Sequence, residues 1–416
     1  MTDSALEQGV LETAGALVKS GPLCDPCLGR PFAALSFGLR NEERGKGLRV
    51  ATALAADSDY EAPDPASCWV CEGVCGRFEE YARRCVEQAE GTEFRTYQVG
   101  TRLPPLIEEN ERLLRADAGL DADVGEQLNS ELNREVGRRV GDMTGTAVDF
   151  ERPDVQFTID LAADEVTIRR HSVAIYGRYR KLERHISQTD WEKYDRSVES
   201  YIAPAMTTVH RGTEGVFHGA GREDVDATMV GTGRPFVLEV KQPRRRRIDL
   251  PEIEQQINSD ADGAVEVEEL QYATHDMIDR VKRHDASKRY RMAIEFGEPV
   301  TADAFELALE RLQGETLEQR TPNRVSHRRA DRVRERTVYD IEGSRESQTE
   351  ATVEVHGEGG LYVKELVSGD EGRTEPSLAG LVEAPAVVTA LDVLAVEGET
   401  EPFATPAFLV DADGQR

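Results

Sequence analysis

The sequence predicts a multidomain α/β (α+β) protein. Its 416 residues are enough for two or three domains, each with a core of its own. Apolar residues recur with helical spacing in some segments and alternate as in strands in others. From composition and periodicity we expect an N-terminal segment over 1–76, an α/β domain over 77–185, a linker helix over 186–200 and a second domain over 201–416.

The first half of the chain contains clear helix and strand signals. Residues 4–19 predict an amphipathic helix that stops at Gly21-Pro22, and another helix is expected before Cys68. A third helix carries apolar residues four apart, namely Leu128, Leu132, Val136 and Val140. Residues 154–160 alternate like a strand, and 166–175 return as its hairpin partner.

The second half predicts a mixed or antiparallel sheet with helices. Helices are expected from Pro251, over 303–313 with Asp303 as the N-cap, and from Pro376. Residues 290–296 and 387–396 read as strands. Residues 353–355 and 361–367 read as a further β-pair.

Composition points to a protein that works in concentrated salt. The net charge is −28, and only eight of the 51 basic residues are lysine. Hydrated carboxylates keep such a protein soluble, whereas an acidic disordered chain would lack the apolar periodicity seen here. No apolar run approaches the roughly 20 residues of a membrane span, so we expect a cytoplasmic protein that does not enter a membrane.

Six cysteines lie near the N-terminus, which favours a metal site over disulfides in a reducing compartment. Cys24 and Cys27 form one C-x-x-C pair, and Cys68 and Cys71 form another. Four thiolates suit a closed, tetrahedral structural zinc site. Cys75 is close enough in sequence to replace one ligand of the second pair, and buried reduced cysteines are the alternative.

Residues 219–240 concentrate unusual charge. They read Gly-Ala-Gly-Arg-Glu-Asp-Val-Asp-Ala-Thr-Met-Val-Gly-Thr-Gly-Arg-Pro-Phe-Val-Leu-Glu-Val. We predict a hairpin whose turn is Gly-Thr-Gly, with Arg222, Asp224 and Asp226 on one face of its first strand. Such a cluster indicates a functional site, although a solvated, salt-bridged hairpin would look the same.

Three basic segments could contact phosphates or unstacked bases. Each has a bland alternative, a charged strand end or a solvated loop. The candidates are Arg178, Arg180 and Lys181, with Arg184 nearby; the run Arg244, Arg245, Arg246 and Arg247; and residues 324–336, which include Arg328 and Arg329.

Several motifs resemble the archaeal and eukaryotic tRNA pseudouridine synthases called Pus-ten. They are Gly-Arg-Glu-Asp-Val-Asp with Gly-Thr-Gly-Arg-Pro-Phe, Lys-Arg-Tyr-Arg at 288–291, Thr-Pro-Asn-Arg-Val-Ser-His-Arg-Arg-Ala-Asp at 321–331, and Tyr-Val-Lys at 362–364 running on to residues 369–377. The likeness extends upstream through residues 177–182 and the first cysteine pair. It therefore covers nearly the whole chain.

The resemblance implies an isomerase that acts on tRNA. It identifies residues 77–185 as a THUMP-like domain, a fold that grips the acceptor end of tRNA, and 201–416 as the catalytic domain. Uridines 54 and 55 of the TΨC arm are the implied targets. Because the isomerisation adds and removes no atoms, we expect no redox or nucleotide cofactor. Separately, we expect a monomer.

The resemblance also assigns site residues. Asp224 matches the catalytic aspartate, Tyr290 the active-site tyrosine whose ring stacks on uracil, and Lys364 the basic residue that pairs with the aspartate. Arg222 and Arg373 are the further substrate-binding candidates. For the basic segments, we expect residues 178–184 to contact RNA on the THUMP side, and residues 244–247 and 324–336 to contact it around the active site. Asp226 lies outside the matched position, and we interpret it as structural.

Two other classes of function stay open from the sequence. A non-catalytic tRNA-binding protein could use the zinc and THUMP modules, although the presence of Asp224, Tyr290 and Lys364 argues against it. Another THUMP-containing enzyme, a methyltransferase or thiolase, would need a cofactor-binding or nucleotide-binding segment, and none is evident.

Overall fold

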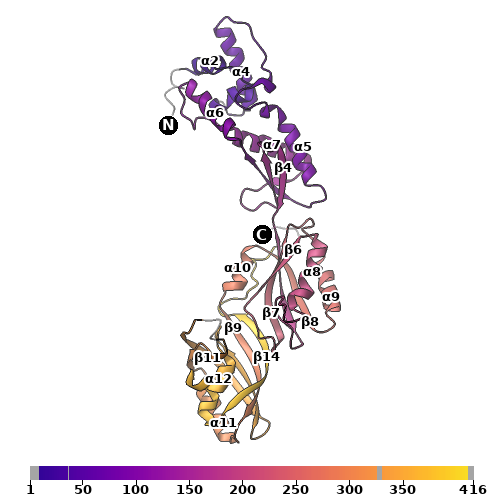
Figure 1. Ribbon diagram of the computed structural model, residues 1–416, viewed down its shortest axis with the longest axis vertical. Helices are drawn as coiled ribbons and strands as arrows, with labels where there is room; N and C mark the ends of the chain where they lie inside the picture. Colours follow the sequence, from indigo (N-terminus) through magenta and orange to yellow (C-terminus); the bar gives the residue numbers. More distant parts are fainter. Residues whose placement is uncertain (1–8, 36, 326–329, 411–416) are drawn as a thin grey trace. The chain divides into compact units, whose positions relative to one another are not determined.

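The computed structural model describes residues 9–35, 37–325 and 330–410. The chain divides into two compact units, residues 1–171 and 172–416 (Figure 1). No helix in these described stretches is long and apolar enough to cross a membrane.

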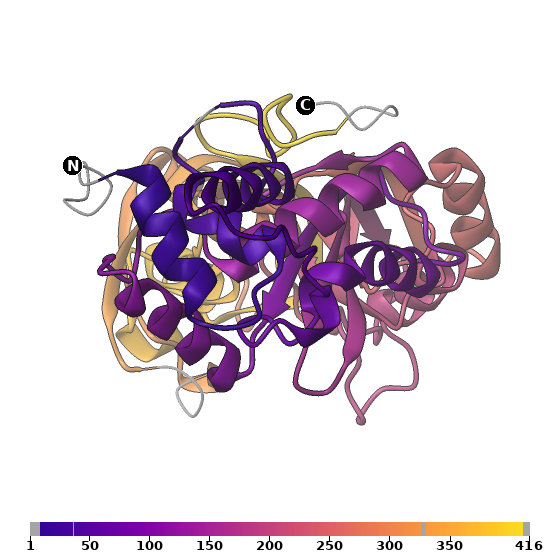
Figure 2. The same cartoon turned by 90° about the horizontal axis from the view of Figure 1, so that it is seen from above.

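Unit 1 begins with helices around the cysteines. The helix predicted over 4–19 is α2, and α2 packs against α4 (Figures 1 and 2). The helices of the unit are α2 (Val10–Lys19), α3 (Asp25–Gly29), α4 (Asn41–Ala55), α5 (Phe78–Gln88), α6 (Pro105–Asp117) and α7 (Leu128–Thr144). The four apolar residues predicted to share one face of α7 are all buried.

A four-stranded sheet completes unit 1, in the order β2-β1-β3-β4. Its strands are β1 (Thr96–Arg102), β2 (Ala147–Val148), β3 (Val155–Asp160) and β4 (Glu165–Arg170). β1 and β3 are parallel, and β3 and β4 form the predicted hairpin. Helices α5 and α7 share one hydrophobic core with these strands and with the cysteines.

Unit 2 is built on one large mixed sheet. The strand order is β13-β10-β11-β12-β9-β14-β7-β5-β8, and β6 pairs with β7 beside this path. The strands are β5 (Val173–Lys181), β6 (Glu214–Gly219), β7 (Thr228–Lys241), β8 (Val265–Ala273), β9 (Ala286–Phe296), β10 (Thr316–Arg320), β11 (Val333–Arg345), β12 (Glu350–Gly357), β13 (Thr374–Glu375) and β14 (Ala386–Gly398).

Helices pack on this sheet in two groups, each with its own core. The helices are α8 (Val198–His210), α9 (Leu250–Asp260), α10 (Asp276–Arg283), α11 (Ala302–Leu312), α12 (Val363–Ser368) and α13 (Leu378–Val382). The first three share a core with β5, β6, β7 and β8. The last three share a core with β9, β11, β12 and β14.

The domain boundary differs from the expected position at residue 185. β4 ends at Arg170, and the next strand, β5, pairs with β7 and β8 of unit 2 instead of continuing the hairpin. Strand periodicity gives the exposed and buried faces of a strand but not its neighbours, so the sequence could not assign β5. The linker helix expected over 186–200 is also absent: that segment is irregular until α8 begins at Val198.

The central hairpin also differs from its prediction. β7 runs without interruption through Gly-Thr-Gly, and its hairpin partner is β6. Gly231 and Gly233 have φ of 58° and 69° and lie at a register shift, because Tyr179 pairs with Arg234 whereas Lys181 pairs with Met229. A Cβ on Gly231 would lie 2.1 Å from the Leu394 carbonyl oxygen, so this glycine serves close strand packing instead of a turn.

Smaller differences concern two helix starts and one strand. Thr301, not Asp303, caps α11 by accepting a hydrogen bond from Ala304 N. Residues 361–367 do not pair with β12; from Val363 onward they form α12. The expected helix beginning at Pro376 starts two residues later, with Ser377 as its cap.

Candidate active site and metal centre

The loop between β6 and β7 carries Asp224. This loop, residues 220–227, joins two antiparallel strands and contains no regular structure. Its consecutive acidic residues point in opposite directions: Glu223 is 6% exposed, whereas the Asp224 side chain is 44% exposed. The loop therefore presents one carboxylate to solvent and buries the one before it.

Among the described residues, two cations contact the Asp224 carboxylate. Lys364 Nζ lies 3.1 Å from Asp224 Oδ2, and Arg324 Nη1 lies 3.3 Å from the same oxygen. Lys364 is in the first turn of α12, and Arg324 is in the short 3-10 turn η4 (Asn323–Val325). The expected neighbour Lys364 is thus in contact. Arg324 belongs to the 324–336 segment expected around the active site, but its contact with Asp224 was not predicted.

Two further carboxylates hold these cations. Glu365 is 4% exposed and accepts hydrogen bonds from Arg324 Nε at 2.7 Å and Nη2 at 3.4 Å. Asp226 Oδ2 lies 3.2 Å from Lys364 Nζ. Burial acts to raise the pKa of Asp226, but the Lys364 ammonium, a backbone hydrogen bond and the Arg324 guanidinium together outweigh burial and lower that pKa. Asp226 thus shares a cation with Asp224, although it lies outside the family motif.

Tyr290 lies two strands away from the start of β7, where the Asp224 loop ends. Met229, at the start of β7, pairs with Val393 of β14, which pairs with Tyr290 of β9. Two strand spacings amount to about 10 Å. Burial raises the pKa of Tyr290 to about 12; the Arg234 guanidinium opposes this rise and the Asp224 carboxylate adds to it. The phenol therefore stays protonated at neutral pH.

Two expected substrate-binding arginines lie apart from the Asp224 carboxylate. The Arg222 guanidinium is 5.9 Å from the centre of the Trp191 ring, in the segment before α8. Arg373 donates to the Thr321 carbonyl at 2.7 Å and to Asp331 at 3.2 Å, and so braces the start of the 321–331 segment.

Two of the basic side chains predicted to contact RNA are buried within the protein. Arg178 donates to the carbonyls of Gly233 and Val396, and Lys181 is completely buried. Arg180 is ion-paired with Glu266 and Glu268 of β8. This corrects the expectation of a THUMP-side RNA contact for Arg178 and Lys181, because β5 is a central strand with neighbours on both edges.

The arginine run Arg244–Arg247 and Asp224 lie at opposite ends of β7. Asp224 precedes the start of the strand at Thr228, and the run follows its end at Lys241. β7 has 14 residues, and at about 3.3 Å per residue it separates the two places by about 40 Å. The expectation that this run surrounds the active site is therefore wrong. Arg247 lies over the Tyr272 ring, 4.2 Å from its centre. Arg328 and Arg329 lie outside the described residues.

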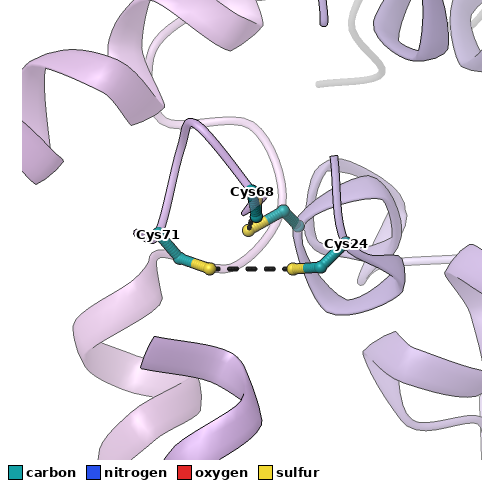
Figure 3. A group of neighbouring side chains, drawn as sticks. Cys24, Cys68 and Cys71 are labelled. Atoms are coloured by element: carbon teal, nitrogen blue, oxygen red, sulfur yellow. Dashed lines mark hydrogen bonds between the residues drawn. The ribbon is translucent and has the colours of Figure 1, made fainter. Parts of the chain in front are cut away.

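The four predicted cysteine ligands come together in unit 1. Their Sγ atoms all lie within 4.8 Å of one another, with Cys27 to Cys68 at 3.6 Å and Cys24 to Cys71 at 3.7 Å; Figure 3 shows Cys24, Cys68 and Cys71. A tetrahedral zinc–thiolate centre with Zn–S of about 2.3 Å has S–S distances of about 3.8 Å. The cluster thus has the size of a metal site, whereas a disulfide would bring two sulfurs to about 2.0 Å.

A buried arginine accompanies the cluster. Arg30 is 1% exposed and donates to Cys27 Sγ at 3.2 Å and to Cys75 Sγ at 3.4 Å. Glu111 and Glu131 hold its guanidinium at 3.2 and 3.0 Å. Cys75, the alternative ligand, contacts the same guanidinium as Cys27, but it is not among the four cysteines whose sulfurs all lie within 4.8 Å of one another.

Both units match models of known protein families. A model described as "Pus10, C-terminal" matches residues 174–397, and one described as "Pus10 THUMP domain, archaeal" matches residues 81–160. These matches define a class of protein, an RNA-modifying enzyme in which a THUMP domain precedes a pseudouridine synthase domain.

Individual relatives extend the match to almost the whole chain. The tRNA pseudouridine synthase Pus10 of Halorubrum lacusprofundi is 57% identical over 422 residues, covering 96% of this chain and 99% of the relative. That of Methanothrix thermoacetophila is 40% identical, covering 95% and 96%, and that of Pyrococcus furiosus is 37% identical, covering 94% and 99%. The chain therefore belongs to the archaeal Pus10 family of tRNA pseudouridine synthases, which are isomerases.

Two further observations accompany this assignment. Halorubrum lacusprofundi is a halophile, in keeping with the salt adaptation that the acidic, lysine-poor composition predicts. A solved Cbf5–Nop10–Gar1 complex aligns with 53% of this chain and 59% of that chain at 14% identity. The TM-score of this alignment is 0.30.

Proposed function

We propose that this protein converts uridines 54 and 55 of the tRNA TΨC arm to pseudouridine, and that Asp224 is its catalytic carboxylate. The observation that carries the proposal is the exposed Asp224 carboxylate on the β6–β7 loop, with Lys364 and Arg324 within 3.3 Å of one oxygen. The relatives are tRNA pseudouridine synthases, and they supply the reaction and the substrate class.

The chemistry breaks the C1′–N1 glycosidic bond, turns the uracil and forms a C1′–C5 bond. The proton on C5 is lost and N1 gains one, so atoms and electrons balance without an oxidant or reductant. The reaction needs a negative group beside an extruded nucleotide. Asp224 supplies that charge, while Lys364 and Arg324, both in contact with its carboxylate, fix the direction of the side chain.

Tyr290 is proposed to hold the extruded base. Its aromatic ring offers a stacking face for uracil. Its hydroxyl is protonated at neutral pH, so it can donate a hydrogen bond to the uracil. It is not already deprotonated and therefore is not ready to accept a proton. Arg222, Arg180 and the Arg244–Arg247 run are proposed RNA contacts away from the reacting nucleotide, acting on phosphates.

The cysteine cluster is proposed to hold one structural zinc ion through Cys24, Cys27, Cys68 and Cys71. Four thiolates close the coordination sphere and leave no position for a substrate, so the ion would stabilise unit 1 instead of entering the reaction. The fit rests on the sulfur spacing and on the buried Arg30 beside Cys27, whose positive charge offsets that of the thiolates. The enzyme is also proposed to act as a monomer, and to act in the cytoplasm, where tRNA is available.

The test is incubation of pure protein with an unmodified tRNA transcript in high salt, without cofactors, followed by mapping of pseudouridine. We expect pseudouridine at positions 54 and 55. Transcripts in which uridine 54 or uridine 55 is replaced by cytidine report each position separately. Binding of tRNA without any pseudouridine would instead support a non-catalytic tRNA-binding protein.

A further inference from the structure

Donors from β5, from the segment after it and from β7 hold the backbone of the Asp224 loop. Five carbonyl oxygens of the loop accept hydrogen bonds from outside it. The donors are Arg234 Nη1 to Ala220, Gln188 Nε2 to Gly221, Lys181 Nζ to Asp224 and Val225, His185 N to Val225, and Arg184 Nη1 to Asp226. Five of the eight carbonyls of this irregular loop are thereby held in place.

Lys181 is central to this set. It is completely buried, and its Nζ donates to the Asp224 carbonyl at 3.2 Å, to the Val225 carbonyl at 3.4 Å and to the Ile186 carbonyl at 2.9 Å. Three carbonyl acceptors match the three donors of an ammonium group. Burying that ammonium is costly unless its partners satisfy it, so its presence under this loop calls for a reason.

Glu223 completes the arrangement as a buried counter-charge. Its carboxylate accepts from Tyr179 Oη at 2.8 and 3.0 Å, lies 2.9 Å from Arg234 Nε and lies 3.7 Å from Lys181 Nζ. Tyr179 in turn accepts from Gln188. Because Glu223 directly precedes Asp224, anchoring its side chain inward sets the direction in which the next side chain points.

We propose that Lys181 and Glu223 are positioning residues for the reaction: they fix the loop backbone so that the Asp224 carboxylate meets the ribose of the target nucleotide in one geometry. This inference rests on the proposed role of Asp224. Lys181 touches neither the carboxylate nor the solvent-facing surface, so it acts through the main chain of residues 224 and 225. A shift of the loop by about 1 Å in its absence costs as much as about 10²-fold in rate.

The experiment compares Lys181→Met with Arg178→Met in the full-length protein. Both residues are buried cations of β5, but Arg178 bonds carbonyls of Gly233 and Val396 and does not touch the loop. Single-turnover pseudouridine formation and tRNA affinity are measured at a temperature where circular dichroism shows all variants folded. We expect Lys181→Met to lower the rate at saturating enzyme by at least about 10-fold with affinity within about 3-fold. Arg178→Met should keep the rate within about 3-fold.

Hydrogen–deuterium exchange of the peptide covering residues 219–228 gives a readout that does not depend on activity. Exchange there should quicken in Lys181→Met and stay at the wild-type rate in Arg178→Met. If Lys181→Met does not fold, Gln188→Met takes its place, because it removes the donor to Gly221 at nearly constant volume. Two outcomes would overturn the proposal. One is an equal loss of rate in Lys181→Met and Arg178→Met; the other is a Lys181→Met variant whose reaction rate and hydrogen exchange both equal those of the wild type.

The same experiment keeps this inference distinct from the proposed function. An inactive wild-type protein would refute the function itself. An active wild type together with an unaffected Lys181→Met would leave the function standing and remove Lys181 from the positioning role.

Discussion

Asp224→Asn is the most informative change, because the surrounding contacts predict separate effects on stability and on catalysis. The substitution keeps the shape of the side chain and removes its charge. Lys364 keeps Asp226 at 3.2 Å, and Arg324 keeps Glu365 at 2.7 Å. Each cation therefore keeps a carboxylate partner, so the free energy of unfolding should change little.

The expected magnitudes follow from these contacts. The Asp224 side chain is 44% exposed, and ion pairs at such exposure contribute about 0–1 kcal/mol each to stability. We therefore expect a loss of at most about 1–2 kcal/mol in unfolding free energy. Removing a group that takes part directly in the reaction costs about 10⁴-fold or more in rate, equivalent to about 5 kcal/mol of transition-state stabilisation.

The assay is single-turnover pseudouridine formation on one tRNA, with binding measured separately and folding confirmed by thermal denaturation. Asp226→Asn is the matched control, since it removes the other carboxylate beside Lys364 and should leave measurable turnover. A folded Asp224→Asn enzyme that keeps a tenth or more of the wild-type rate would refute the assignment of the carboxylate to Asp224.

Three further predictions concern other parts of the molecule. Tyr290→Phe should reduce the rate by less than about 10-fold if the ring acts by stacking, against about 10²-fold or more for proton transfer. The pKa of Tyr290 is raised to about 12 in the folded protein, from about 10 in an unfolded chain. The contribution of the protonated phenol to the free energy of unfolding is therefore complete below pH 10 and is lost between about pH 10 and 12. In denaturant titrations, Tyr290→Phe should abolish this loss of stability. Elemental analysis should find one zinc per chain, and full zinc content in Cys24→Ser would exclude Cys24 as a ligand. Replacement of Arg244–Arg247 by glutamine should weaken tRNA affinity substantially while the saturated rate stays near wild type, since the run lies about 40 Å along β7 from Asp224; unchanged affinity would identify a solvated loop.

The sequence by itself determined the chemical groups and much of the local structure. Helical spacing located α7, and proline in the first turn located α9. Paired cysteines at C-x-x-C spacing predicted the four-sulfur cluster, because thiolate ligands arrive two to a loop. The motif around Asp224 identified the family, and the pairing of Lys364 with this aspartate was expected from it. These properties depend on residue type and on short-range spacing, which can be read along the chain.

Tertiary structure alone decided which distant side chains meet. Arg324 reaches Asp224 across 100 residues of sequence, and nothing local distinguishes it from the other arginines of its segment. Lys181 reads as a surface cation beside tyrosines, yet it is fully buried because β5 lies between β7 and β8. Alternation in a strand reports which face is apolar but not which strand will lie beside it. The neighbours of β5, and with them the buried support of the Asp224 loop, follow from the long-range packing of the whole sheet.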